Sequence, residues 1–171
     1  MKAGVIANIR KDGVRALVPR FIEALQAEGI ETVVDASLAP IIGGRFRFEP
    51  TESFFRGADL IVSFGGDGTI LYTARLSAGT GIPILGINLG KVGFLAEISP
   101  DEIDNVPARI REGGFELFDH MACRIRTSIS GQYFALNDVV LDRNTDTRIL
   151  TLTMAVDGFM AGEMTADGLI V

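Results

Sequence analysis

The sequence predicts an α/β fold that changes character along the chain, from a parallel sheet to antiparallel strands. In the first part, short apolar runs alternate with helical patterns, which is typical of strands joined by crossover helices. In the second part, apolar and polar residues alternate with a period of two, and hairpin turns separate the runs. We therefore expect a Rossmann-like parallel-sheet domain at residues 1–113, followed at 114–171 by the first part of an antiparallel β-sandwich-like domain.

The parallel-sheet domain is expected to begin with a buried strand at residues 3–7, which form a short apolar run. Apolar residues at helical spacing then predict a helix over residues 14–25, and Gly29 ends it. A second strand is expected at 31–34. The stretch from there through Pro50 is expected to be an irregular, mobile loop.

Two further strands complete the expected parallel sheet. Residues 60–64 form an apolar strand that stops at the glycine-rich residues 65–69, and a helical pattern follows at 70–76. Residues 83–87 form the fourth apolar run. Because strand and helix alternate throughout, the carboxyl ends of these strands should share one edge of the sheet.

The last helix of this domain has a recognisable start. Ser99 is placed as its N-cap, Pro100 as its first helical residue, and Glu102 as the residue that closes a capping box. Pro107 is expected to kink or restart the helix because it cannot donate a backbone hydrogen bond.

The second part is expected to be antiparallel, with the boundary between residues 113 and 120. Residues 123–129 alternate between apolar and polar, and 130–132 form a hairpin turn. Residues 150–156 alternate in the same way, and Asp157-Gly158 makes the next turn.

Charge and cysteine content exclude several classes of protein. The 171 residues carry a net charge of −6, so the chain lacks the cationic surface that holds nucleic acids or anionic membranes. Its one cysteine, Cys123, permits neither an internal disulfide nor a thiolate zinc cluster. No apolar run suits a signal peptide or approaches the roughly 18 residues that span a bilayer. We therefore expect a cytoplasmic protein with no nucleic-acid or membrane partner.

The strongest functional signal is the run Gly65-Gly66-Asp67-Gly68-Thr69, which follows an apolar strand and opens a helix. A helix N-terminus offers N–H groups to a phosphate, and glycines let that phosphate approach the backbone. Asp67 is then placed to act as a general base on a hydroxyl acceptor or as a magnesium ligand. The alternative is a tight turn in which Asp67 merely caps the helix.

Two other segments combine glycines or polar residues with a strand end. Residues 86–95 contain three glycines, but their spacing is not that of the dinucleotide-binding fingerprint, and alone they predict a turn with Phe94 and Leu95 in the core. Asn137 and Asp138 interrupt an apolar strand, so they lie at a bulge or face a ligand. An amide beside a carboxylate suits ribose hydroxyls or an adenine edge.

Together these segments resemble the ATP-NAD kinase family. Residues 65–69 match its GGDGT motif, and 88–95 match its N-x-G-x-x-G-F-L loop. Asn137-Asp138 match its asparagine and acidic pair, and residues 165–171 are similar to the stretch that introduces its T-P-T-G-S-T-A-Y loop. The four motifs occur in the family's order, and the resemblance covers essentially the whole chain.

The resemblance implies roles for particular residues. Asp67 would be the catalytic carboxylate, and Phe94 would lie against the adenosine part of the dinucleotide. Thr165 stands where the family often has a basic residue, so the contact that this basic residue would make is not expected here. For Arg148, a surface position on a strand is the alternative. The binding residues implied are Gly65, Gly66, Asp67, Gly68, Thr69, Phe94, Asn137, Asp138, Arg148 and Asp167.

The activity that the resemblance implies is phosphoryl transfer from ATP, or from inorganic polyphosphate, to the adenosine ribose 2′-hydroxyl of NAD, giving NADP. Mg²⁺ or another divalent cation would accompany the donor phosphates, and no residue is assigned as its ligand. Arg10 and Lys11 are expected to be solvated, with the alternative that they face the donor. The partners implied are small-molecule nucleotides and, in the complete protein, further copies of the chain.

The sequence stops at Val171, before the family's T-P-T-G-S-T-A-Y loop, so we expect a truncated kinase that is weakly active or inactive alone. One alternative is a diacylglycerol or lipid kinase, since the resemblance at residues 65–69 extends to that group. The absence of an amphipathic membrane face weighs against it. A non-catalytic dinucleotide-binding fragment is the second alternative.

Overall fold

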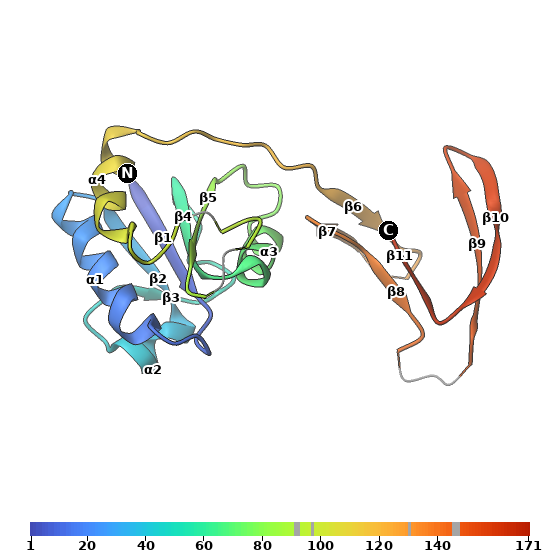
Figure 1. The fold of residues 1–171 in the computed structure, drawn as a ribbon, viewed down its shortest axis with the longest axis horizontal. Helices are drawn as coiled ribbons and strands as arrows, with labels where there is room; N and C mark the ends of the chain where they lie inside the picture. Colours follow the sequence, from blue (N-terminus) through green and yellow to red (C-terminus); the bar gives the residue numbers. More distant parts are fainter. Residues whose placement is uncertain (91–92, 97, 130, 145–147) are drawn as a thin grey trace. The chain divides into compact units, whose positions relative to one another are not determined.

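The computed structural model describes residues 1–90, 93–96, 98–129, 131–144 and 148–171. The chain divides into two compact units, Met1–His120 and Met121–Val171 (Figure 1). The division follows His120, at the end of the range 113–120 in which the sequence placed the boundary. Residues 114–120 form neither helix nor strand and lead from the last helix of the first unit toward the second.

Five parallel strands form the sheet of the first unit, in the order β3-β2-β1-β4-β5. Because β1 pairs with β2 on one side and with β4 on the other, the winding of the sheet reverses between β1 and β4. The expected α/β fold with a parallel sheet is confirmed. The strands are β1 (Lys2–Ala7), β2 (Glu31–Asp35), β3 (Phe48–Glu49), β4 (Leu60–Gly65) and β5 (Ile84–Asn88).

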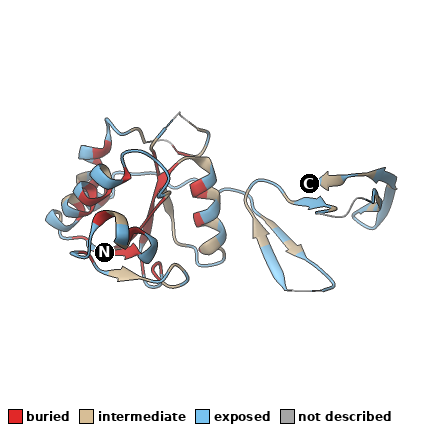
Figure 2. Cartoon of the chain, turned by 90° about the horizontal axis from the view of Figure 1, so that it is seen from below, coloured by how far each residue is buried: buried red, intermediate tan, exposed pale blue. Residues whose placement is uncertain are grey.

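Side chains of this sheet enter the core alternately on its two faces, as the pleat requires. Val5 packs on one face with Val18 and Ile22 of α1 (Val14–Ala27), and the neighbouring Ile6 packs on the other face with Phe54. Figure 2 shows the buried residues concentrated along these strands and the helices that cover them. The helix predicted over residues 14–25 is therefore confirmed.

The stretch between β2 and β4 is more regular than the sequence predicted. It contains a 3-10 turn at Ala36–Leu38, the short helix α2 (Ala39–Ile42) and the edge strand β3. Leu38, Ile42 and Phe46 are buried and fix this stretch to the core. The expectation of an irregular loop was wrong. The elements of this stretch are too short to show a periodicity in the sequence, and the burial of their apolar side chains holds them in place.

The expected helix start at Pro100 was also wrong. The Glu102 carboxylate does accept hydrogen bonds from the Ser99 backbone N–H at 3.0 Å and from its hydroxyl at 2.8 Å. However, a turn and a 3-10 segment follow, and α4 (Val106–Glu112) begins later, with Pro107 in its first turn. Since Pro107 has no N–H to donate, the helix restarts there, as predicted.

The second unit consists of antiparallel strand pairs. β6 (Cys123–Arg126) pairs with β7 (Gln132–Ala135), β8 (Val140–Asp142) with β11 (Gly168–Ile170), and β9 (Leu150–Val156) with β10 (Phe159–Ala166). Asp157 and Gly158 both have positive φ, which is the geometry of the tight hairpin turn predicted there.

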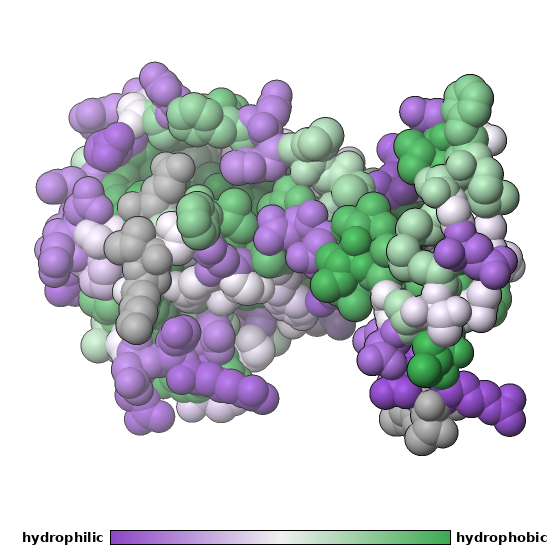
Figure 3. Space-filling model, turned by 45° about the vertical axis from the view of Figure 1, so that its right-hand side comes forward, coloured by the Kyte–Doolittle hydropathy of each residue, from purple (hydrophilic) through white to green (hydrophobic). Residues whose placement is uncertain are grey.

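The described residues of the second unit include none that is buried, and many of its apolar side chains are exposed. Figure 3 shows such apolar side chains, in green, at its surface. In the part of the chain that the structure describes, no helix is both long and apolar enough to cross a membrane.

Candidate functional site

The candidate site lies at the carboxyl ends of β1, β4 and β5, where the winding of the sheet reverses. The backbone N–H of Asn8, just after β1, donates to the carbonyl of Phe64 in β4 at 2.9 Å. The N–H of Leu89, just after β5, donates to the carbonyl of Gly65 at 2.7 Å. Open parallel sheets bind ligands at this kind of reversal, because the loops on either side diverge and leave a crevice.

The glycine-rich turn joins the end of β4 to the start of α3 (Asp67–Leu76), as the sequence predicted. A Cβ atom on Gly65 would overlap the Thr69 side chain, so glycine is required there for the helix to turn back on the strand. In contrast, Cβ atoms on Gly66 or Gly68 would point into open space. Backbone N–H groups at the start of α3 can therefore be approached by a ligand.

Asp67 does not cap its own helix. Gly66 occupies the N-cap, and the Asp67 carboxylate instead accepts backbone hydrogen bonds from the loop after β5. The N–H of Phe94 donates to Oδ2 at 2.9 Å, and the N–H groups of Leu95 and Ala96 donate to Oδ1 at 3.0 and 3.4 Å. The alternative in which Asp67 merely caps α3 is therefore wrong.

These contacts favour the charged form of the Asp67 carboxyl. The hydrogen bond from Phe94, followed by that from Leu95, holds the pKa of the Asp67 carboxyl below its ordinary value of 3.8. The group is consequently ionised at neutral pH. Oδ2 accepts one of the three bonds, so it keeps lone-pair capacity for a hydroxyl or a cation.

Glycines also fit the loop after β5 to its neighbours. A Cβ atom on Gly93 would overlap the Asp67 carboxylate, and one on Gly86 would overlap Ile70 of α3. The buried Asn88 fixes the start of the loop, because its Oδ1 accepts the N–H of Gly90 at 2.9 Å. Residues 91 and 92 of this motif lie outside the described residues.

Phe94 is 99% exposed, and Leu95 is partly buried. The prediction that both residues pack in the core was wrong for Phe94, because the three N–H contacts to Asp67 hold the loop at the surface. The exposed ring of Phe94 offers a face on which a flat ligand could stack. Because the Phe94 N–H donates to the Asp67 carboxylate, two of the predicted site residues lie next to each other.

The remaining predicted site residues belong to the second unit. Asn137 and Asp138 are exposed between the end of β7 and the start of β8, so they stand at a break between strands rather than inside one. Arg148 is exposed just before β9. Asp167 lies between β10 and β11, with its Oδ1 3.5 Å from Nε of Arg143.

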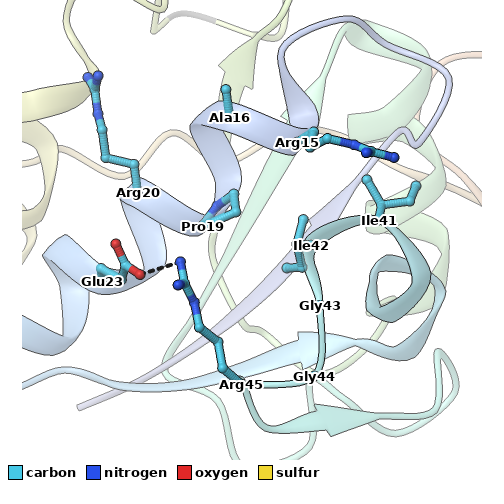
Figure 4. Close-up of a pocket in the computed structure, with 10 residues that line it drawn as sticks. All are labelled: Arg15, Ala16, Pro19, Arg20, Glu23, Ile41, Ile42, Gly43, Gly44 and Arg45. Carbon is cyan, nitrogen blue, oxygen red and sulfur yellow. Dashed lines mark ion pairs between the residues drawn. The ribbon is translucent and has the colours of Figure 1, made fainter.

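A shallow hollow of about 550 Å³ opens elsewhere on the first unit, between α1 and the residues around α2 (Figure 4). It contains none of the predicted site residues. Arg45 on its rim is paired with Glu23, and Arg20 with Asp104. Because two of its cations already have carboxylate partners, this hollow is a weaker candidate than the strand ends.

Comparisons with known proteins agree with the motifs. The family model for the ATP-NAD kinase N-terminal domain matches residues 3–115. The chain is 34% identical over 174 residues to an NAD kinase of Geobacter sulfurreducens, covering 99% of this chain and 61% of that protein. It is 42% identical over 122 residues to an NAD kinase of Oleidesulfovibrio alaskensis, covering 69% of this chain and 42% of that protein.

Solved structures give the same result for the fold. An NAD kinase from Archaeoglobus fulgidus in complex with ATP matches with a TM-score of 0.69 and 29% identity, over 99% of this chain and 59% of that one. The yeast NADH kinase complexed with NADH matches with a TM-score of 0.84 at 21% identity, over 99% of this chain and 56% of that one, which shows the fold alone. The chain spans about 60% of the length of the relatives that it matches throughout.

Proposed function

The chain belongs to the ATP-NAD kinase family, and from this membership we propose that it is part of a kinase that phosphorylates NAD to NADP. The donor is ATP or inorganic polyphosphate, and the acceptor is the 2′-hydroxyl of the adenosine ribose. The observation that carries the proposal is the Asp67 carboxylate, held by three backbone N–H groups at a strand-to-helix turn beside the exposed Phe94.

In the proposed reaction the 2′-hydroxyl oxygen attacks the terminal phosphorus of the donor. The bond from that phosphorus to its bridging oxygen breaks, and ADP or a shortened polyphosphate leaves. The hydroxyl proton passes to Oδ2 of Asp67, which accepts one hydrogen bond and retains a lone pair. The bonds that lower the pKa of Asp67 weaken it as a base but fix its position and its charge, and phosphoryl transfer depends mainly on such positioning.

The ligand contacts in this proposal follow the motifs. The donor phosphates approach the open backbone at Gly66 and Gly68, and the adenosine of NAD stacks on Phe94. In the second unit, the residues proposed to contact the ribose or adenine are Asn137 and Asp138, and Arg148 and Asp167 are proposed as further ligand contacts. Support for these roles comes from the exposure of all four side chains.

A divalent cation accompanies the donor in this proposal. Among the described residues, no group of three or more His, Cys, Asp or Glu side chains gathers to hold a metal ion. Mg²⁺ in phosphoryl-transfer sites is held by one or two carboxylates together with substrate phosphates and water, so the Asp67 carboxylate would fit that pattern as an alternative to its role as proton acceptor. When bound, the cation supplies charge neutralisation on the phosphoryl oxygens. For the complete protein, assembly into homo-oligomers and a cytoplasmic location stay predictions.

The test uses the chain extended by the segment that its relatives carry beyond the matched part. We expect this protein to form NADP from NAD and ATP with Mg²⁺. Asp67→Asn should lower turnover about a hundredfold or more, the scale of a lost general base, while NAD still binds. Asp101→Asn is the matched control, because Asp101 is an exposed carboxylate outside the site.

Three outcomes would contradict the proposal. If the Asp67→Asn variant turned over as fast as the parent protein, Asp67 would have no catalytic role. Phosphorylation of diacylglycerol in vesicles, without NADP formation, would favour a lipid kinase. NAD binding without turnover by the extended protein would favour a non-catalytic dinucleotide-binding module.

A further inference from the structure

We propose that Lys11, in the loop after β1, extends across the carboxyl end of β4 and binds the phosphate chain of the donor. The inference rests on the proposed function, since it names a residue that contacts the donor in that site. It separates Lys11 from its neighbour Arg10, which the sequence treated as equivalent.

The backbone of the loop after β1 fixes the place of Lys11. Asn8 uses its Oδ1 to accept the N–H of Arg10 at 3.1 Å and its carbonyl to accept the N–H of Lys11 at 3.0 Å. These bonds close a turn directly at the strand end, and the N–H of Asn8 is itself bonded to Phe64 of β4. Lys11 therefore starts just after the carboxyl end of β1, beside β4.

The side chain of Lys11 then reaches the other boundary of the site. A Cβ atom on Gly90, which follows β5, would lie 3.3 Å from the Lys11 Nζ. Since β4 lies between β1 and β5 in the sheet, the lysine crosses the carboxyl end of β4, where the glycine-rich turn begins. The ammonium group thus stands beside the loop that binds Asp67.

The charge of this group is available for a ligand. No ion pair among the described residues includes Lys11, and its side chain is exposed. The N-terminus of α3 adds positive dipole character at the same strand end. Two positive features at the same strand ends are favourable for a polyanion, and a lysine on a flexible stem can follow a chain of phosphates.

The experiment measures binding of inorganic tripolyphosphate and of ATP with Mg²⁺ to the 171-residue chain by calorimetry. Lys11→Ala should raise the dissociation constant for tripolyphosphate about tenfold, the effect of one lost charged hydrogen bond. Lys11→Arg should restore binding to within about threefold of the parent, because the charge is kept. If ATP loses affinity as tripolyphosphate does, the contact is with the phosphates that the two probes share.

Lys2→Ala is the matched control. Lys2 begins β1 at the opposite edge of the sheet, and its Nζ donates to the Arg56 carbonyl at 3.1 Å. The variant removes the same charge from the chain, so it should bind tripolyphosphate as the parent does. If both variants bound tripolyphosphate equally weakly, the loss of affinity would come from the change in net charge, and the proposal would be overturned.

Two further results would also overturn it: unchanged tripolyphosphate binding by Lys11→Ala, or no measurable binding by the parent chain. In the extended protein, Lys11→Ala should raise the KM for ATP and leave the dissociation constant for NAD unchanged. Binding that depends on Lys11 in a protein that forms no NADP would contradict the proposed function while supporting the phosphate contact. The two failures are therefore distinguishable.

Discussion

The two units of the chain differ in how they bury apolar residues. In the first unit, helices cover both faces of a parallel sheet, and side chains such as Phe54, Ile61 and Phe64 are fully buried. In the second unit, strand pairs leave Phe159 78% exposed and Ile170 69% exposed. Hairpins therefore form from local turn and pairing signals, whereas a core requires a second layer over the sheet.

The largest effect expected from this comparison is on stability. Phe64 is buried and contacts Phe21 edge to face, with the ring centres 5.3 Å apart. Phe64→Ala should lower the free energy of unfolding of the first unit by about 3–5 kcal/mol, through lost burial and a cavity. Phe159→Ala, its matched control in the second unit, should change it by less than about 0.5 kcal/mol.

Urea unfolding followed by the helical circular dichroism signal measures this difference, because the helices of the described chain lie in the first unit. Equal losses in the two variants would show that the second unit contributes to the same cooperative core, and the contrast between the units would fail.

A smaller effect is expected on ligand affinity in the second unit. Asn137→Ala should weaken NAD binding by the extended protein by about 1–3 kcal/mol, because hydrogen bonds to the ribose or adenine are lost. The melting temperature should hardly change, since Asn137 is exposed between strands. Gln132→Ala, an exposed amide in β7, is the control. A lower melting temperature with unchanged NAD affinity would show that Asn137 is structural.

The smallest effect concerns the pH dependence of the first unit. Because the pKa of Asp67 is lowered in the folded state, its N–H contacts stabilise the fold above the ordinary value of 3.8. That contribution is lost as the pH falls through the folded pKa. The amide resonances of Phe94, Leu95 and Ala96 should therefore shift together in an acid titration, below pH 3.8.

Asp67→Asn supplies the check on that titration, because the three amides should no longer shift together in the variant. A shift centred at or above pH 3.8 in the parent chain would contradict the three backbone hydrogen bonds to the Asp67 carboxylate.

The sequence predicted many elements of the first unit because each has a local signal. The apolar run of β1, the helical spacing of α1 and the glycine at its end are all read within one segment. The turn at Asp157-Gly158 was predicted for the same reason, since its backbone conformation favours those residue types. Residues 36–49 were missed because elements of two to four residues carry no periodicity.

The candidate site was predicted as motifs but not as contacts. The family resemblance identified Asp67 and Phe94 as site residues, yet residues 86–95 taken alone predicted Phe94 in the core, and the cap of α3 remained an alternative role for Asp67. It also gave no reason to choose between Arg10 and Lys11. In the structure, Asp67 accepts hydrogen bonds from residues 27 to 29 positions later in the chain. No local pattern encodes a contact over that separation.

Local sequence patterns alone were enough to predict the α/β class, the strand-to-helix turn at residues 65–69 and the family to which the chain belongs. Tertiary structure decided which groups meet there: the N–H groups of the 94–96 loop on Asp67, and the Lys11 ammonium beside Gly90. The physical reason is the strand order, in which β4 pairs between β1 and β5. That order brings the loops after three strands to one edge, and the packing of the whole sheet, rather than any one segment, fixes it.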